Sequence, residues 1–142
     1  GITPSIGAFI EAMDGERVEL GSKLGLELPT VLEQYQILYQ ADGKTLSEAV
    51  KKNKAYEEVM GQKRVDTRYM LEDIPMSLYP MVSLAKHLGC SCERMENIVE
   101  LGCFILQKDL KAIGRTMESL GFEDMSLEEI LEYAETGIKK AN

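Results

Sequence analysis

The sequence predicts an all-α fold of about six to eight helices packed around one or two buried ones. No stretch of the 142 residues alternates apolar and polar side chains in the way that a half-buried strand does. Apolar residues instead recur every three or four positions, and residues that start or stop helices separate these stripes. Two Ser/Thr-x-x-Glu capping boxes, at Thr45–Glu48 and Ser126–Glu129, mark the beginnings of two helices.

The first helix is expected to begin at Pro4 and to end at Gly25. Thr3 is a good N-cap for a proline at the first helical position, and glycine is the preferred residue of a left-handed C-cap. Arg17 is the one charge on the apolar stripe of this helix. Its guanidinium either reaches an edge of the domain or pairs with an acid inside it, and the sequence leaves both interpretations open.

Three more helical segments are predicted before residue 62. One follows Pro29–Thr30 and carries two tyrosines, whose spacing favours core packing over a cofactor contact. Another begins at the Thr45 capping box, and a short piece is expected from Tyr56 to Met60, where Gly61 stops it. Basic residues outnumber acidic ones from residue 48 to 68, which indicates either a solvated surface or a rim that attracts anionic substrates.

The second half of the chain is predicted to hold four helices. The first, Met76–Leu88, contains Pro80, which implies either a kink or a later start. Ser91 is expected to cap the next helix, whose apolar residues cover most of its girth, so we predict that it is the buried central helix. After a short helix at Thr116–Leu120, the Ser126 capping box starts the last one.

The composition limits the class of protein. The chain has 142 residues, 44% of them hydrophobic, and a formal net charge of −8 with a pI of about 4.8. This length suits one compact domain over residues 1–142, and the charge argues against binding to nucleic acid or to an anionic membrane. No apolar run approaches the ~20 residues that span a bilayer, and no signal peptide opens the chain. Three cysteines in a chain of this size indicate a reducing compartment, so we expect a cytoplasmic protein.

The segment from Arg68 to Pro75 is expected to contain a break in the helical structure. This segment combines a basic residue, an aromatic residue and two adjacent acids. A residue before proline avoids the α conformation, so we expect Ile74 to be extended or in a turn and Pro75 to open a new helix. Asp73 would then lie just outside a helix N-terminus, ionised and fixed in direction. The segment indicates either an Arg–Asp ion pair that closes a loop or a site that binds an anion and orients a base.

The run Arg68–Pro75, followed by Met76-Ser77-Leu78, resembles the most specific signature of the NAD/NADP octopine/nopaline (opine) dehydrogenase family. In that family the signature lies in a C-terminal helical domain. Three other stretches resemble the same domain in order and spacing, and they are Gly1–Ser5, Glu11–Arg17 and Gly114–Gly121. The resemblance implies a compact all-α domain of the kind found in opine dehydrogenases and in related 6-phosphogluconate-dehydrogenase-like reductases.

The resemblance also implies a function. Such enzymes join an amino acid to a 2-oxo acid and reduce the resulting imine with NAD or NADP. Arg68 would bind a substrate carboxylate, and Asp73 would be the catalytic residue that orients a histidine and stabilises its protonated form. Tyr69, Glu72 and Arg17 would flank the site without an assigned role. The family's catalytic histidine motif and glycine-rich dinucleotide fingerprint do not occur in the sequence. We therefore expect a separate N-terminal dinucleotide-binding domain to hold the cofactor, and the chain alone to be inactive.

A metal site is the weaker interpretation of His87, Cys90, Cys92 and Cys103. The ligand types suit zinc, but Cys103 would lie about 16 Å from Cys92 along a continuous helix, whereas zinc ligands lie ~4 Å apart. We therefore expect no metal. His87 is the only histidine, and its expected role is that of a cation near the C-terminus of its helix.

Two other classes of function compete with the enzyme. A helical interaction module would pair subunits through the exposed side of its apolar helices, and an enzyme domain of this family would remain compatible with that role. A helix-turn-helix DNA-binding protein is disfavoured, because no basic recognition helix follows a short turn. The expected partners are therefore the dinucleotide-binding domain, an amino acid, a 2-oxo acid and a second copy in a homodimer, but not nucleic acid or a membrane.

Overall fold

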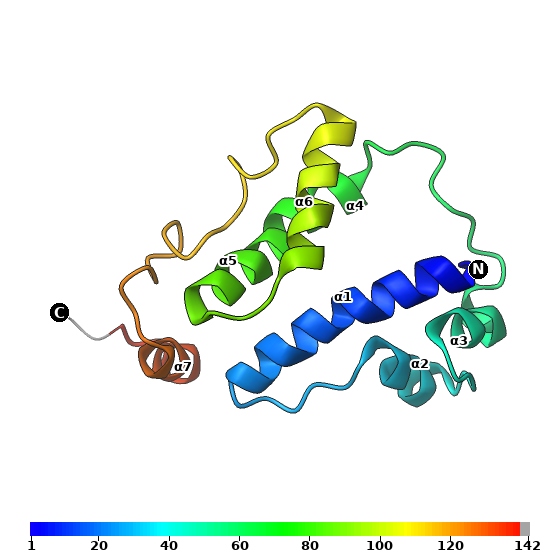
Figure 1. Ribbon diagram of the computed structural model, residues 1–142, viewed down its shortest axis with the longest axis horizontal. Coiled ribbons are helices and arrows are strands. Elements are labelled where there is room, and N and C mark those ends of the chain that lie inside the picture. The colour runs from blue at the N-terminus through cyan, green and yellow to red at the C-terminus, as the bar shows by residue number, and fades with distance from the viewer. Residues whose placement is uncertain (140–142) are drawn as a thin grey trace.

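The computed structural model describes residues 1–139, which contain helices and no strand (Figure 1), so the prediction of an all-α fold is confirmed. No helix in this range is both long and apolar enough to cross a membrane. The elements in chain order are α1 (Pro4–Lys23), α2 (Val31–Tyr39), α3 (Leu46–Lys52), the 3₁₀-helix η1 (Lys54–Tyr56), α4 (Arg68–Leu71), the π-helix η2 (Ile74–Leu78), α5 (Tyr79–Leu88), α6 (Glu93–Leu106) and α7 (Leu127–Thr136).

The 20-residue helix α1 lies between the α2–α3 pair and the α5–α6 pair and contacts both pairs (Figure 1). Its ends agree with the sequence-based prediction. Thr3 caps the start by accepting a hydrogen bond from the Ile6 N–H, and Gly25 follows the last turn with a left-handed φ of 75°. The first helix therefore forms the central support of the domain.

Two acidic side chains of α1 bind the N-termini of the helices on one side. Glu11 Oε1 accepts a hydrogen bond from the Leu46 N–H of α3 at 3.2 Å, and Asp14 Oδ2 accepts one from the Val31 N–H of α2 at 2.6 Å. The first N–H groups of a helix lack partners within it, and the helix dipole favours a negative charge there. These contacts fix where α2 and α3 begin relative to α1.

Glu16 performs the same role for α6 from a buried position. Glu16 is 4% exposed, and its carboxylate accepts hydrogen bonds from the N–H groups of Arg94 (2.9 Å) and Met95 (3.0 Å) in the first turn of α6. The prediction that Ser91 caps this helix is wrong, because α6 begins after Cys92, whose side chain makes no capping bond. A carboxylate 78 positions away from Arg94 in sequence replaces the local cap.

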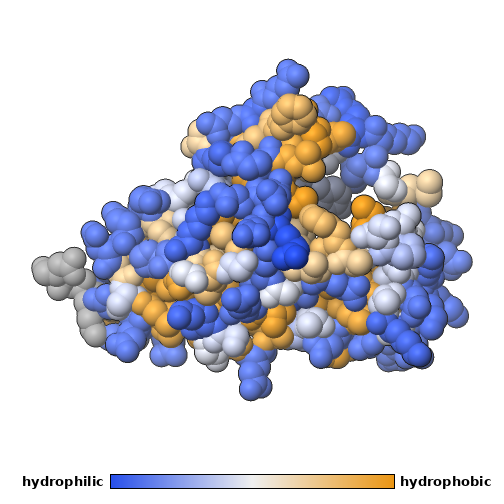
Figure 2. Space-filling view, in the orientation of Figure 1, coloured by the Kyte–Doolittle hydropathy of each residue, from blue (hydrophilic) through white to orange (hydrophobic). Residues whose placement is uncertain are grey.

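The core lies where α1, η2, α5 and α6 meet. Its buried members are Leu20, Ile74, Val82, Ala85, Cys92, Met95, Val99 and Leu110. The prediction that α6 is buried on most of its girth is wrong, because Leu101, Phe104 and Ile105 are 48%, 81% and 46% exposed. Figure 2 shows apolar side chains on the surface over the upper end of α6. Only the face of α6 that carries Met95 and Val99 is covered by the rest of the domain.

Two of the predicted short helices do not form. The expected helix at Tyr56–Met60 is replaced by the single turn η1, because residues 54–62 are all exposed and have no packed face to stabilise a helix. Residues 116–120 form turns. There the Ser119 N–H donates to Thr116 Oγ1 (3.1 Å) and the Thr116 N–H donates to Ser119 Oγ (2.8 Å), and such local bonds compete with a helix.

Candidate functional site

The segment Arg68–Pro75 is helical almost throughout. α4 leads through Glu72 and Asp73 into η2 and then into α5 (Figure 1). Pro75 lies in the first turn of η2, as predicted. The expected extended or turn conformation at Ile74 is wrong. Asp73 has φ −67° and ψ −33°, so it lies within the helical run and not beyond its end. Ile74 is only 4% exposed, and its burial in the core outweighs the preference of a residue before proline.

Two prolines five residues apart account for the π-helix. The Tyr79 N–H donates to the carbonyl of Ile74, five residues earlier. The matching donor for the Pro75 carbonyl would be residue 80, but Pro80 has no N–H. The Arg115 N–H donates to the Pro75 carbonyl instead, at 3.1 Å. Because α5 begins at Tyr79, the later start that Pro80 allowed is the interpretation that the structure confirms.

Gly114 allows the segment before Arg115 to approach the π-helix closely. A Cβ at Gly114 would lie 2.4 Å from the Tyr79 ring and 3.2 Å from the Pro75 carbonyl oxygen. The first distance is too short for any side chain, so only glycine fits without movement of the ring. The Gly114-Arg115 pair therefore holds the π-helix that directly follows Asp73.

Replacing Gly114 by alanine should lower the free energy of unfolding by about 1–3 kcal/mol, because the added methyl group displaces Tyr79 from a packed position. Urea unfolding followed by circular dichroism measures this loss. The matched control is Gly15→Ala on α1, where nothing lies within 4 Å of the added Cβ. That change should stabilise the helix by roughly 0.5–1 kcal/mol. Equal stability of the Gly114 variant and the wild type would contradict the packing described here.

The candidate residues of the motif lie on the surface of this helical run. Arg68 Nε is 3.1 Å from Glu72 Oε2, one turn later, and the two side chains are 77% and 57% exposed. Exposed pairs of this kind contribute only ~0–1 kcal/mol, so Glu72 orients the guanidinium without sequestering it. Tyr69 and Asp73 are exposed as well. Within residues 1–139, Arg68 pairs with Glu72, and the Asp73 carboxylate pairs with no basic side chain. The predicted Arg68–Asp73 ion pair is therefore not the contact that closes this segment.

Arg17 has a structural role. Its Nε donates to Asp14 Oδ1 at 2.7 Å, and its Nη2 donates to the Pro29 carbonyl oxygen at 2.7 Å. The guanidinium thus ties α1 to the loop that enters α2. This contact agrees with the interpretation in which the head pairs with an acid of the domain. A flanking role of Arg17 in the substrate site stays a prediction.

The cysteines and the histidine form no metal cluster within the described part of the chain. Cys90, Cys92 and Cys103 are free thiols, and burial raises the pKa of Cys92 above its usual value. The ring Nε2 of His87 lies 2.8 Å from the Met125 carbonyl oxygen, so it acts as a donor that fixes the loop before α7. His87 thus has a structural contact of its own.

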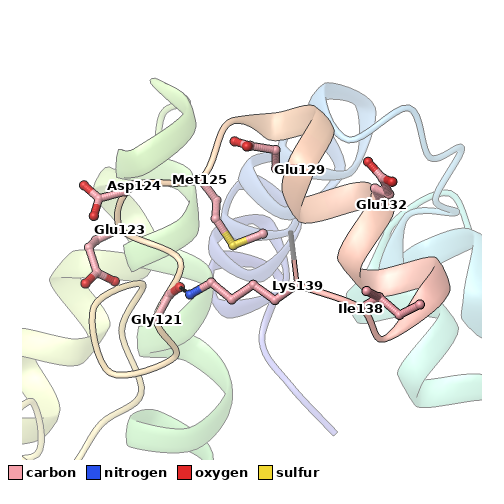
Figure 3. Close-up of a pocket in the computed structure, with 8 residues that line it drawn as sticks. All are labelled: Gly121, Glu123, Asp124, Met125, Glu129, Glu132, Ile138 and Lys139. Carbon is pink, nitrogen blue, oxygen red and sulfur yellow. Dashed lines mark hydrogen bonds between the residues drawn. The ribbon is translucent and has the colours of Figure 1, made fainter. Parts of the chain in front are cut away.

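A small hollow of about 70 Å³ lies beside α7 (Figure 3). The Lys139 amine donates to the carbonyl oxygen of Gly121 at its edge. Four acidic side chains line the hollow, and they are Glu123, Asp124, Glu129 and Glu132. An anionic dinucleotide is repelled by such a lining, so this part of the surface is unsuited to the cofactor.

The sequence profile of the NAD/NADP octopine/nopaline dehydrogenase alpha-helical domain matches residues 1–106. The chain belongs to this family. The matched range includes Arg68, Asp73 and the π-helix that follows them. The opine dehydrogenase of Arthrobacter sp. (strain 1C) is 32% identical over 126 residues, which cover 89% of this chain and 35% of that protein. The resemblance inferred from the sequence motif is therefore confirmed at the level of the family.

Other proteins are similar to this chain as well. Protein ocs of Agrobacterium tumefaciens (strain Ach5) is 26% identical over 114 residues, which cover 80% of this chain and 32% of that protein. A solved structure of octopine dehydrogenase with NADH and L-arginine matches the whole chain with a TM-score of 0.77 at 19% identity, over 41% of its own length. This likeness shows that the opine dehydrogenase helical domain shares the fold. The chain spans about a third of the length of these two curated relatives.

Proposed function

We propose that this chain is the C-terminal helical domain of an NAD(P)-dependent opine-type dehydrogenase, which condenses an amino acid with a 2-oxo acid. The observation that carries the proposal is the family match over residues 1–106, within which Arg68 and Asp73 are exposed on one short helical run. A dinucleotide-binding domain of the same cytoplasmic enzyme would hold NAD or NADP and supply the histidine. The bound cofactor would supply the hydride that reduces the imine.

Arg68 would bind substrate, and Asp73 would orient the catalytic histidine. Arg68 presents a planar guanidinium, which binds both oxygens of a carboxylate, and both substrates of the reaction carry one. Asp73 presents an unpaired carboxylate that would accept a hydrogen bond from the ring of the histidine. Its negative charge would stabilise the imidazolium, the form that donates a proton as the imine forms and is reduced. The π-helix, held by Gly114 and Arg115, would keep the Asp73 backbone in place.

Replacing Arg68 by lysine tests the carboxylate-binding role in the complete enzyme. The variant should raise the KM for the 2-oxo acid, or lower kcat, by roughly tenfold or more, because lysine replaces a bidentate contact by a point charge. The measurement is NAD(P)H oxidation with pyruvate and a panel of amino acids. Arg64→Lys is the control, because Arg64 is an exposed arginine in the preceding connection whose partner is Asp66. Unchanged kinetics of the Arg68 variant would remove this residue from the site.

A second candidate function is subunit pairing. The observation that favours it is the exposed apolar group on α6 formed by Leu101, Phe104 and Ile105. A packed dimer would cover such residues, and related reductases are expected to use a similar domain in this way. Sedimentation of the chain at micromolar concentration separates the alternatives, because a strict monomer would argue against a dimerisation module and would leave the enzymatic proposal intact.

A further inference from the structure

A hollow of about 520 Å³ opens beside the first residues of the chain. Gly1 and Ile2 form one wall, the end of α3 forms a second, and the connection from η1 to α4 forms a third. A Cβ at Gly1 would lie 3.5 Å from Lys51 Cγ, so the first residue contacts α3. In Figure 1 the N-terminus lies next to α3 and to the start of this connection. Any residues that precede Gly1 therefore leave from the edge of this hollow.

The hollow is bordered by apolar side chains that residues 1–139 leave uncovered. Val59 and Met60 of the connection line the hollow and are 64% and 85% exposed. Tyr56 and Tyr69 line it as well, and they are 45% and 60% exposed. A single exposed apolar residue is ordinary on a protein surface. Four of them around one hollow form a patch of the kind that another segment covers.

The main chain of the connection also has free hydrogen-bonding groups beside the hollow. Within residues 1–139, the N–H groups of Met60, Gly61 and Gln62 donate to no acceptor. The chain enters α1 in an extended conformation, because Thr3 has φ −73° and ψ 160°. A segment that continues this conformation keeps its own main-chain groups free, so it can pair with those of the connection.

We propose that this hollow is the docking site of the segment that precedes Gly1 in the complete enzyme and leads to the dinucleotide-binding domain. The proposal rests on the proposed function, which requires that domain, and on the lengths of the two curated relatives, of which this chain spans about a third. The segment lies extended along the connection, and its apolar side chains pack on Met60 and Tyr56. Because Tyr69 belongs to α4, the segment also contacts the helix that carries Arg68. The position of the dinucleotide-binding domain is thereby tied to the candidate site.

Photo-crosslinking in the complete enzyme identifies what occupies the hollow. Met60 is replaced by the photo-crosslinking amino acid p-benzoyl-L-phenylalanine, which should leave the core intact because this side chain is 85% exposed. Mass spectrometry of the digested product should place the main adduct within about ten residues before Gly1, since an extended chain of that length spans roughly 33 Å. An adduct only with the body of the dinucleotide-binding domain, an adduct only with a second subunit, or no adduct would each overturn the proposal.

Leu38 is the matched control position for the crosslinking experiment. It is an apolar residue of α2 that is 68% exposed, and it does not line the hollow. The same photo-crosslinking amino acid at position 38 should give no adduct with the segment before Gly1. An adduct as abundant as that from position 60 would overturn the proposal, because the segment would then not be confined to the hollow.

Met60→Asp tests the apolar contact separately, because it places a charge where the apolar side chains of the segment pack. The segment should leave the hollow more often, and a protease of broad specificity should cleave it about tenfold faster in the complete enzyme. Leu38→Asp adds the same charge on α2 and should leave the cleavage rate unchanged. Equal cleavage rates for the Met60→Asp enzyme and the wild type would overturn the proposal.

These outcomes are distinct from those of the proposed function. An adduct with the residues before Gly1, in a complete enzyme that forms no opine, would retain the docking site and reject the enzymatic assignment. A complete enzyme that forms the opine but gives no such adduct would retain the enzymatic assignment and overturn the docking site.

Discussion

Replacing Asp73 by asparagine should lower kcat of the complete enzyme by about 10²–10⁴-fold, the range of a general acid–base contribution. Asparagine keeps the size and the exposed position of the side chain but cannot stabilise an imidazolium. Loss of the negative charge lowers the pKa of the histidine beside it, so the limb of the pH–rate profile that reports this histidine should move to lower pH. Steady-state NAD(P)H oxidation over a range of pH measures both effects.

Asp42→Asn is the matched control for this prediction, because it removes an exposed carboxylate in the turn before α3. That variant should keep both kcat and the pH–rate profile of the wild type. An Asp73→Asn enzyme with an unchanged profile would show that the carboxylate does not act on the histidine. A lower kcat without a shift of the profile would assign Asp73 to another task in the site.

Replacing Glu16 by alanine should be the most destabilising single change within the α1–α6 contact. The free energy of unfolding is expected to fall by about 2–4 kcal/mol, because the buried Met95 N–H and the partly buried Arg94 N–H of α6 lose their acceptor. This is a large part of the roughly 5–15 kcal/mol that stabilises a typical domain. Urea unfolding followed by circular dichroism measures the loss.

Two further variants make the Glu16 test specific. Glu16→Gln keeps one carbonyl oxygen as an acceptor, so its loss should be intermediate. Glu19→Ala removes an exposed acid from the same helix and should change the stability by no more than ~0.5 kcal/mol. A Glu16→Ala protein as stable as the Glu19→Ala protein would contradict the proposal that α1 caps α6.

Local patterns in the sequence predicted most of the helices but not how they are held together. The start of α1 at Pro4, the Thr45 cap of α3 and the capping box of α7 follow from residues within one turn, and the structure confirms them. The capping box predicted at Thr45–Glu48 is only half formed, because the Glu48 carboxylate accepts a hydrogen bond from the Lys44 N–H instead of the Thr45 N–H. The cap of α6 could not be predicted in this way, because its acceptor is Glu16, far away in the sequence. The apolar residues around α6 predict burial on most sides, whereas Phe104 lies on a surface that the domain leaves uncovered.

In the candidate site, too, the sequence predicts the local features, whereas the contact between distant residues is known only from the structure. The motif residues Arg68 and Asp73 were visible in the sequence because their residue types and order are distinctive. The π-helix beside them was not predicted, although the spacing of Pro75 and Pro80 matches one π-turn and was an available signal. The Pro75 carbonyl of this π-helix accepts a hydrogen bond from the Arg115 N–H. Because Arg115 lies far along the chain, this contact can be known only from the fold.

The stretches that resemble the family outside the motif have a common physical explanation. Glu11, Asp14 and Glu16 of α1 bind the N-termini of three helices, and Gly114 packs against the π-helix. Gly114 contacts the helical run that carries Arg68 and Asp73, and Glu16 holds α6, which packs against η2 of that run. Glu11 and Asp14 fix the starts of α3 and α2.

Mass spectrometry of the reaction product shows whether the complete enzyme joins an amino acid to a 2-oxo acid. The complete enzyme is incubated with NADH or NADPH, pyruvate and one amino acid at a time. The expected product is a secondary amine that joins the amino acid to the pyruvate carbon skeleton. It should form in equal amount to the nicotinamide cofactor oxidised, and more slowly in the Arg68→Lys and Asp73→Asn variants. A folded enzyme that forms no such product with any amino acid, or that forms it equally well without Arg68 and Asp73, would contradict the account.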